Sequence, residues 1–410
     1  MSETRTADAA ADTAAGASGD EAAVSGVDAS GPVIIDHERL ADFIAEIFRH
    51  AGCSDAESVR IGTSLVGANL AGHDSHGVIR SALYVELLAG GVQVADQRIE
   101  VLIDSGALML VDGKYGMGQT VGPAAVQLGI ERCTELGVAV VGLRNAGHLG
   151  RIGEYAEMAA DEGLVSMHFV NVANSRLVAP FGAKSRRMGT NPCAFGAPVA
   201  GRRPVIHDFA TSVVAEGKAM VALHGGPAVP DNALVSGDGE ITGDPRVLYS
   251  FAEGQRPNSM NGAGALRAMG EHKGSGIAVM CELLAGALTG TGTAGPRRVR
   301  FANGMLSVYI DPARVDTAAG ATDLGYDDIA AAYLDWFCEA DAIDAQRPVQ
   351  LPGDVEHERR QQRMAAGITL PAETWESICS GARAAGVPEA SIASAVRAMP
   401  PGAVSTLQQA

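Results

Sequence analysis

The sequence predicts an α/β protein, and three observations support this fold class. Apolar segments of strand length alternate with segments of helical periodicity between residues 108 and 172. Helical periodicity also dominates both ends of the globular part, over residues 37–88 and 358–386. Finally, 47% of the 410 residues are hydrophobic and 19% are charged, which supplies a large core and excludes a collagen-like or wholly disordered chain.

The N-terminal part is expected to be a tail followed by helices. Residues 1–32 hold almost no large apolar side chain, so they cannot bury enough surface to offset their ordering entropy and are expected to be disordered. They lack the basic start and the apolar run of a signal peptide. Helical spacing then predicts helices over residues 37–52, 55–71 and 80–88, the last of which carries Tyr84.

The rest of the chain supplies the expected sheet and further helices. The patterns in order are residues 108–113 (strand), 124–136 (helix), 137–145 (strand), 154–163 (helix), 164–172 (strand), 275–288 (helix) and 305–311 (strand). Two helical pieces follow within residues 358–386, around a turn at Leu370 and Pro371.

Charge and cysteine content exclude several classes of function. The chain has 31 Lys plus Arg against 48 Asp plus Glu, for a net charge of −17. Such a surface repels phosphate backbones and anionic lipid, so neither a nucleic-acid nor a membrane partner is expected. The six cysteines are scattered without CxxC pairing, which disfavours structural zinc and a disulfide framework and fits a reducing cytoplasm.

A match to the dinucleotide-binding pattern GxGxxG lies in the wrong context. Gly290, Gly292 and Gly295 fit the pattern, but a predicted helix precedes them and a strand follows. A Rossmann turn needs the reverse order, because the N-terminus of its helix must meet the pyrophosphate. The sequence therefore predicts no standard Rossmann site.

The densest polar cluster is residues 72–80, with the sequence GHDSHGVIR. Arg80 can bind a carboxylate through two hydrogen bonds, Ser75 can add a donor and a histidine can move a proton, so the cluster suits an anionic substrate. Tyr84 shares a helical face with Arg80 if both lie on one helix. A helix-capping turn with Asp74 or Ser75 as N-cap is the alternative. No third ligand accompanies the two histidines, so no metal site is expected.

His148 is a second candidate for chemistry. It follows the predicted strand over residues 137–145, lies among glycines and precedes a helix. The C-terminal ends of strands are where α/β folds place catalytic groups. A loop histidine that serves only local hydrogen bonding is the alternative.

Other polar, glycine-punctuated segments suit a ribose or a phosphate, and suit turn and cap chemistry as well. They are residues 189–198, residues 208–212 with Lys218, and residues 272–276. In the last segment a helix is expected to begin at Ser275, so that its free amides and Lys273 would form an anion-binding cradle. Cys193 has no adjacent base and is interpreted as a small buried hydrophobe.

Taken together, these segments resemble the malate/L-lactate dehydrogenase family of NAD(P)-dependent oxidoreductases. The motifs that carry the resemblance run in order from about His37 to Gly386 and are GHDSHGVIR, RNAGHLGRIGEY, MGTNPCAFGAP, DFATS, EGKAM, HKGSGI and LPGD. The family includes sulfolactate, ureidoglycolate and diketogulonate dehydrogenases and is unrelated to the Rossmann-fold lactate and malate dehydrogenases. The resemblance implies a non-Rossmann, sulfolactate-dehydrogenase-like fold with a mixed sheet and helical N- and C-terminal parts.

The resemblance also implies roles for individual residues. Ser75 and His76 match the active-site Ser-His pair, whose histidine is a proton donor in some members. Arg80 and Tyr84 match positions near the substrate carboxylate, and His148 matches the acid/base of other members. Contacts with the dinucleotide are implied at Asn174, Ser175, Asp208, Ala210, Thr211, Ser212, Lys218, His272, Lys273, Gly274, Pro352, Gly353 and Asp354.

The domain division follows from the same resemblance. Residues 33–120 are expected to form a mostly helical substrate-site segment that packs with the C-terminal part, and residues 121–310 an α/β dinucleotide-binding domain. Residues 311–410 would be a helical segment that completes the fold. The stretch over residues 223–259 and Ser275 depart from the family pattern, which leaves the substrate open. A homodimer with its sites near the subunit interface is implied.

The expected activity is the interconversion of a 2-hydroxy acid and a 2-oxo acid by hydride transfer with NAD or NADP, in the cytoplasm. Arg80 would anchor the substrate carboxylate, and His148 or His76 would exchange the proton of the C2 oxygen, with His148 preferred because it lies at the end of a strand. Reduction of a cyclic imine such as piperideine- or pyrroline-2-carboxylate is one alternative, and non-catalytic ligand binding on the same fold is another.

Overall fold

The computed structural model describes residues 31–395 except for 224, 226, 252–257, 260, 298 and 317–323, and the statements below refer to these residues. Contacts divide the chain into Met1–Gly31 and Pro32–Ala410, and the second unit holds every helix and strand named below. The expected disorder of the tail falls on residues 1–30, which lie outside the described part. Among the described helices, none is long and apolar enough to cross a bilayer.

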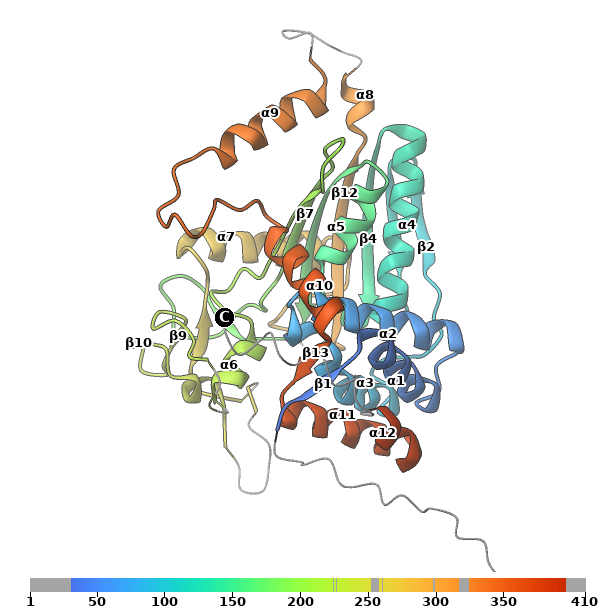
Figure 1. The fold of residues 1–410 in the computed structure, drawn as a ribbon, viewed down its shortest axis with the longest axis vertical. Helices are drawn as coiled ribbons and strands as arrows, with labels where there is room; N and C mark the ends of the chain where they lie inside the picture. The colour runs from blue at the N-terminus through green and yellow to red at the C-terminus, as the bar shows by residue number, and fades with distance from the viewer. Residues whose placement is uncertain are drawn as a thin grey trace, which may run out of the picture. The chain divides into compact units, whose positions relative to one another are not determined.

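A seven-stranded mixed sheet forms the centre of the fold (Figure 1). Its strands in spatial order are β2 (Glu100–Ser105), β3 (Leu108–Asp112), β4 (Val138–Ala146), β12 (Ala302–Ile310), β5 (Val165–Ala173), β7 (Cys193–Ala197) and β8 (Val205–Phe209). β3 and β4 pair in parallel, whereas the other neighbouring strands of this sheet pair antiparallel. The predicted α/β class and mixed sheet are therefore confirmed.

β12 lies between β4 and β5, which are successive strands in the sequence. It pairs antiparallel with β4, where Leu306 faces Gly142, and with β5, where Leu306 faces Phe169. β4 and β5, joined through α5 (Gly153–Asp161), therefore run in the same direction without touching. The alternation of strands and helices predicted the elements, but it did not show that a strand from residue 302 onward would be inserted between them.

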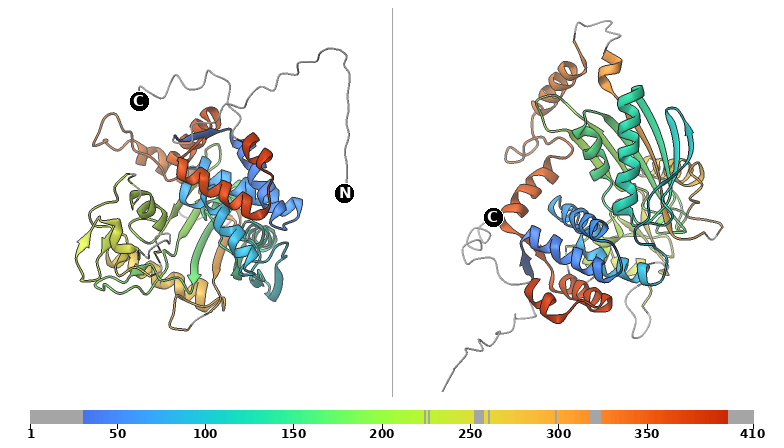
Figure 2. Two further views of the ribbon diagram at one scale, coloured as in Figure 1. Left: turned by 90° about the horizontal axis from the view of Figure 1, so that it is seen from below. Right: turned by 90° about the vertical axis from the view of Figure 1, so that its right-hand side faces the viewer.

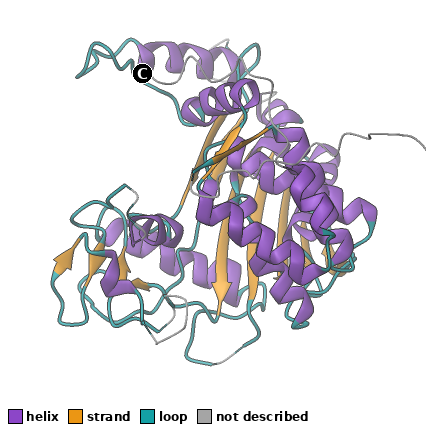
Figure 3. Cartoon of the chain, turned by 60° about the horizontal axis from the view of Figure 1, so that its bottom comes forward, coloured by secondary structure: helices purple, strands orange, loops and turns teal. Residues whose placement is uncertain are grey.

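Helices lie over the strands of the large sheet, as Figure 3 shows from another side. α4 (Gly118–Leu136) and α5 pack their apolar faces on the sheet around Val121, Val126 and Tyr155. α4 begins six residues before the predicted start at residue 124, because the helix continues through Pro123 instead of beginning after it. This early start places the first turn of α4 beside the loop that carries His148.

The two ends of the described chain share a second core. The predicted N-terminal helices are confirmed as α1 (His37–His50), α2 (Asp55–Leu70) and α3 (Ser81–Ala89), and they pack with α11 (Ala372–Ala385) and α12 (Glu389–Ala395). β1 (Val33–Ile35) pairs antiparallel with β13 (Ile368–Leu370), so the predicted turn before Pro371 is a short strand. The domain boundaries at residues 120 and 310 stay a prediction.

A smaller four-stranded sheet forms a third layer with its own core. Its strands in spatial order are β10 (Ile241–Thr242), β9 (Leu234–Val235), β11 (Ala265–Arg267) and β6 (Val178–Ala179), and α6 (Glu216–Leu223) and the 3₁₀ turn η3 (Pro245–Leu248) lie nearby. α7 (His272–Cys281) continues into the π-helical segment η4 (Glu282–Ala287), which confirms the predicted helix but moves its start from Ser275 to His272. Cys193 is buried as predicted, with its Sγ 3.4 Å from that of Cys281.

The C-terminal helices depart from the sheet and return to it. After α8 (Pro312–Asp316), α9 (Tyr326–Cys338) projects beyond the end of the large sheet in Figure 1 and in the right-hand view of Figure 2. α10 (Asp354–Ala366) then packs against α2 near residues 72–80. Most of α9 therefore stays exposed, whereas α10 meets the polar cluster found in the sequence.

Acid should destabilise the fold through a histidine in the core. His168 on β5 is fully buried, and its two ring nitrogens lie 2.8 Å from Ser307 Oγ and 3.1 Å from Ser166 Oγ. Burial lowers the pKa of His168 to about 3. Below pH 6.5 this histidine therefore binds a proton in the unfolded chain but stays neutral in the folded chain. This linkage should remove about 2 kcal/mol of unfolding free energy between pH 7 and pH 5.

Chemical denaturation at the two pH values checks this prediction with two variants. His168→Gln should flatten the loss of stability with falling pH, while His50→Gln, at the exposed end of α1, should leave it as in the parent. An unchanged pH slope in His168→Gln would contradict the assignment.

Candidate active site

The cluster over residues 72–80 folds as two consecutive 3₁₀ turns between α2 and α3. The turns are η1 (Asp74–His76) and η2 (Val78–Arg80). Neither turn has a side-chain cap, so the alternative of a simple capping turn is not what the structure shows. Instead, Ser75 Oγ lies 3.1 Å from His76 Nδ1, and Arg80 Nε donates to the carbonyl oxygen of Ser75 at 2.6 Å.

His148 joins this cluster from a different part of the chain. It follows the end of β4, as predicted, and its Nδ1 lies 2.6 Å from the Oη of Tyr84 on α3. Its ring stacks on that of His76, with 5.7 Å between the ring centroids and 9° between the planes. The five residues that the sequence singled out for substrate chemistry therefore meet in one place, from η1, η2, α3 and the loop after β4.

Both stacked imidazoles are neutral in the free protein at physiological pH. Burial, together with the smaller effect of the nearby Arg80 charge, lowers the pKa of His148 to about 3. Burial also lowers the pKa of His76 well below its usual value, with additional repulsion from His148 and Arg80. Burial raises the pKa of Tyr84 to about 12, so its hydroxyl stays protonated. A neutral imidazole can accept a proton or donate one in a hydrogen bond.

Arg80 supplies a fixed positive charge beside these rings. Its Nε is engaged by the Ser75 carbonyl, and its two terminal nitrogens have no hydrogen bond or ion pair with any residue in the described ranges. A guanidinium held in this way presents a planar pair of donors that matches a carboxylate. The site therefore has an anion anchor whose charge acts on two groups that can exchange protons.

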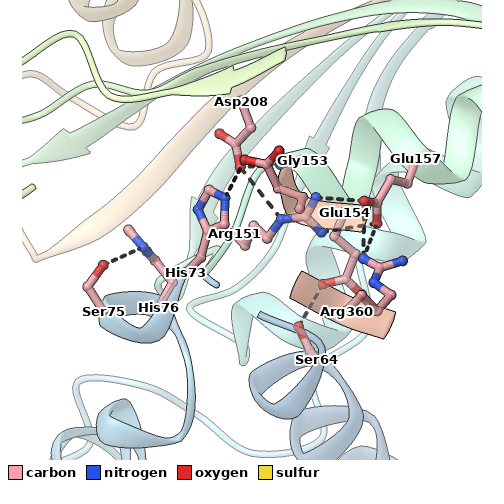
Figure 4. Close-up of polar contacts among 11 residues, drawn as sticks. Ser64, His73, Ser75, His76, Arg151, Gly153, Glu154, Glu157, Asp208 and Arg360 are labelled. Carbon is pink, nitrogen blue, oxygen red and sulfur yellow. Dashed lines mark hydrogen bonds and ion pairs between the residues drawn. The ribbon is translucent and has the colours of Figure 1, made fainter. Parts of the chain in front are cut away.

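α10 holds the cluster in place. Arg363 donates to both carboxylate oxygens of Asp74, at 2.6 and 3.0 Å, and His73 Nε2 lies 3.3 Å from Glu356 Oε1 (Figure 4 shows His73). These contacts span nearly 290 positions of the sequence. Sequence reasoning missed Arg363 and Glu356, because nothing in an amphipathic, highly charged helix indicates which charges face the site.

A buried ionic network supports the loop that carries His148 (Figure 4). Arg151 is 4% exposed and donates to Glu157 at 2.6 and 3.0 Å, and Glu157 also accepts from Arg360 of α10. Asp208 on β8 accepts from the amide of Gly153 at 2.8 Å and lies 4.0 Å from Arg151. Asp208 thus ties β8 to the start of α5, and its implied contact with a dinucleotide stays a prediction.

Two glycines allow backbone segments to close on the site. A Cβ on Gly118, the first residue of α4, would lie 2.1 Å from the carbonyl oxygen of His148. A Cβ on Gly217 of α6 would lie 2.6 Å from Ser75 Cβ. Only glycine permits these approaches, so α4 touches the His148 loop and α6 touches Ser75 directly. Lys218, the next residue of α6, is exposed.

The other residues implied in dinucleotide contacts lie mostly around the end of β8. Thr211 and Ser212 follow β8, and their hydroxyls donate to the carbonyls of Thr190 and Val214. Met269, just before α7, donates its amide to the Thr211 carbonyl, which brings the start of α7 to the same place. Among the remaining residues, Asn174 and Ala210 are half-buried and Ser175 is buried. The segment Pro352–Asp354 reaches β8, because the Pro352 carbonyl accepts a hydrogen bond from the amide of Ile206.

The predicted anion cradle at Ser275 is wrong. α7 begins three residues earlier, and the amides of Lys273, Gly274 and Ser275 donate to the carbonyls of Gly270, Met269 and Glu271. These amides are therefore satisfied within the chain instead of being free for an anion. The side chains of His272 and Lys273 remain exposed in the first turn, and the His272 ring contacts Phe181 edge-on at 5.9 Å.

Sequence reasoning also missed Gln119, the second residue of α4. Its Nε2 donates to Tyr84 Oη at 3.3 Å and to the His148 carbonyl at 3.1 Å, and the residue is 1% exposed. A glutamine followed by threonine at a helix start carries no pattern that indicates a site. Among the described His, Cys, Asp and Glu residues, no group of three is placed to hold a metal ion.

Comparison with known proteins relates this chain to a broad set of enzymes. The family model described as malate/L-lactate dehydrogenase matches residues 35–379. Hydroxycarboxylate dehydrogenase B of Escherichia coli K12 is 36% identical over 359 residues, which cover 86% of this chain and 95% of the relative.

Two further relatives extend the comparison. The Δ1-pyrroline-2-carboxylate/Δ1-piperideine-2-carboxylate reductase of Pseudomonas syringae pv. tomato is 31% identical over 344 residues, covering 82% of this chain and 92% of the relative. The solved structure of sulfolactate dehydrogenase from Methanocaldococcus jannaschii superposes with a TM-score of 0.72 at 26% identity, covering 86% of this chain and 98% of that one.

Proposed function

This chain belongs to the malate/L-lactate dehydrogenase family, and on that premise we propose that Arg80, His76 and His148 form the active site of an enzyme that interconverts a 2-hydroxy acid and a 2-oxo acid. The observation that carries the proposal is the convergence of one guanidinium with free terminal nitrogens and two stacked, neutral imidazoles. A 2-hydroxy or 2-oxo acid needs these two functions side by side, because its carboxylate and its reacting C2 oxygen are on adjacent carbon atoms.

The residues divide the work by their chemistry. Arg80 holds the substrate carboxylate and stays charged at any working pH, so it serves as an anchor and not as a proton donor. His148, or His76 in its place, exchanges the proton of the C2 oxygen, and Ser75 and Tyr84 orient the two rings. Once a carboxylate pairs with Arg80, the charge that helps to lower the pKa of both histidines is offset, which makes their protonation easier during the reaction.

The residues present fit a nicotinamide dinucleotide where the end of β8 meets the start of α7, which Met269 joins to Thr211. An open pocket lies between the loop Pro180–Lys184 and the start of α7, lined among others by Phe181, Lys184, Arg267 and Glu271. Phe181 offers a ring on which a base can stack and Lys184 offers a charge for a phosphate, whereas Arg267 is paired with Glu271 at 2.8 Å. When bound, the nicotinamide supplies or accepts the hydride at C2. Asn174, Ser175, Thr211, Lys218, His272 and Lys273 are proposed to hold this cofactor, as NAD or NADP.

The function is tested by following NAD(P)H oxidation with a panel of 2-oxo acids and both cofactors. At least one 2-oxo acid should be reduced with a catalytic efficiency of 10⁴ M⁻¹s⁻¹ or more, roughly the lower bound for natural enzyme–substrate pairs. The cyclic imines piperideine-2-carboxylate and pyrroline-2-carboxylate belong in the panel, because a relative of this chain is named for them. Preference for the imines would favour reduction of C=N, and inactivity toward every compound would favour non-catalytic binding.

Variants of the three central residues test the division of labour. Arg80→Ala should raise KM strongly, and should also lower kcat if Arg80 sets the position of C2. His148→Ala should lower kcat by ~10²-fold or more, the usual contribution of a general acid/base, and His76→Ala should affect kcat less. Steady-state kinetics against pH checks this. Losses of only a few-fold in both histidine variants would show that the proton comes from elsewhere.

We further propose a cytoplasmic homodimer. The cytoplasmic location rests on the scattered cysteines of the sequence. Assembly is supported by two apolar surfaces. α9 exposes Tyr333 and Trp336, which are 57% and 68% accessible, and α7 with η4 exposes Val279, Met280 and Leu283, followed by the exposed Leu288. Contiguous apolar patches of this kind mark interaction surfaces, and a second copy of the chain is the partner that the family implies.

Light scattering at micromolar concentration tests the assembly. The parent should have the mass of a dimer, whereas Trp336→Glu combined with Leu283→Glu should shift it toward the monomer by placing charges in the buried surface. Val59→Glu, at an isolated exposed position on α2, is the matched control and should leave the mass unchanged. A fully active monomeric parent would refute the dimer.

A further inference from the structure

A chain of three hydrogen-bonding groups leads from α4 to the candidate acid/base. Gln119 Nε2 lies 3.3 Å from Tyr84 Oη, and Tyr84 Oη lies 2.6 Å from His148 Nδ1. Gln119 is 1% exposed and Tyr84 is fully buried, so water does not replace these contacts. The direction in which each group donates therefore has consequences for the imidazole.

The amide of Gln119 can have only one orientation. The same Nε2 that faces Tyr84 also lies 3.1 Å from the carbonyl oxygen of His148, which can only accept a hydrogen bond. An amide oxygen in that place would face another oxygen, so the NH₂ group must occupy it. Gln119 consequently donates to Tyr84 Oη, and the lone pairs of that oxygen are partly used.

The proton of Tyr84 then has one partner in the described part of the chain, which is His148 Nδ1. If His148 instead carried its proton on Nδ1, Tyr84 would accept from both neighbours and its own buried O–H would be left without an acceptor. Leaving a buried donor unsatisfied costs about 1–3 kcal/mol. The neutral ring is thus stabilised with Nδ1 as acceptor and with its proton on Nε2.

We infer that Gln119, acting through Tyr84, is a positioning residue that sets the tautomer of His148 so that its Nε2–H is presented to the substrate. The effect of this tautomer on the reaction rests on the proposed function. A 2-oxo acid held by Arg80 meets an N–H donor at its C2 oxygen, which polarises the carbonyl in the reductive direction. The oxygen of the reduced C2 then takes the Nε2 proton while the Tyr84 hydroxyl passes its proton to Nδ1, so that the imidazole stays neutral, and Tyr84 regains a proton from water. His76, whose Nδ1 faces Ser75 Oγ, stacks on this ring and limits its rotation.

Nuclear magnetic resonance of protein labelled with ¹⁵N-histidine tests the tautomer without any substrate. Long-range ¹H–¹⁵N spectra at neutral pH distinguish protonated from unprotonated ring nitrogens, and His148→Gln identifies the signals of His148 by their loss. The parent should show a protonated Nε2 and an unprotonated Nδ1. A protonated Nδ1 in the parent would overturn the inference by itself.

Two variants and a control connect the tautomer to Gln119. Gln119→Leu and Tyr84→Phe should each move His148 toward a mixture of tautomers, whereas Gln127→Leu, at an exposed position of the same helix, should leave the spectrum unchanged. Tyr84→Phe keeps the ring that packs at 6.4 Å from Phe48, so it decides the question if Gln119→Leu does not fold. An unchanged tautomer in Tyr84→Phe would refute the inference.

Kinetics supply the second measurement. In both variants kcat for reduction should fall roughly tenfold with KM little changed, as expected if the competent tautomer drops to about a tenth of the population. A parallel rise of KM would indicate a general distortion of the site instead. If no 2-oxo acid is reduced but the parent shows the Nε2–H form, the proposed function fails and the tautomer assignment stands.

Discussion

An unbalanced positive charge beside two half-buried imidazoles is the interaction on which this site depends. Arg80 has no carboxylate partner among the described residues, although acidic side chains lie close by. Asp74 is engaged by Arg363, and Asp208 by the amide of Gly153 and by Arg151. Burial is the main cause that lowers the pKa of both histidines, and a guanidinium without a counter-ion adds to it and leaves a place for an anion. Binding a substrate carboxylate would complete the charge balance that the protein itself leaves open.

Holding this arrangement together requires segments from the whole length of the chain. η1 and η2 carry Ser75, His76 and Arg80, but α10 restrains their loop through Arg363 and Glu356. The loop after β4 carries His148, and it is restrained by the cap from Asp208 and by the buried Arg151. These ion pairs join several layers of the fold and fix positions more than they add net stability. The Arg363–Asp74 pair is partly exposed and so contributes little, and the buried Arg151 incurs a solvation cost that its pairing offsets.

The site residues were predictable to the extent that their chemistry stands out locally. Two histidines, a serine and an arginine within a few positions are unusual in a turn, and His148 follows a clear apolar strand, so both could be found without the structure. The anion cradle at Ser275 failed because the start of α7 depends on backbone hydrogen bonds to residues 269–271, which no side-chain pattern reveals. Gln119 has no local signal, since its role exists only where α4, α3 and the His148 loop meet.

The sequence by itself determined the class of the fold, the positions of most helices and strands, and the chemical groups of the site. Periodicity and composition carry this information because an element buries the side chains that its own repeat brings to one face. Only the tertiary structure decided that β12 is inserted between β4 and β5, that α10 closes on residues 72–80, and that His76 stacks on His148. These features are contacts between residues far apart in the chain, where a single sequence records each partner but not their pairing.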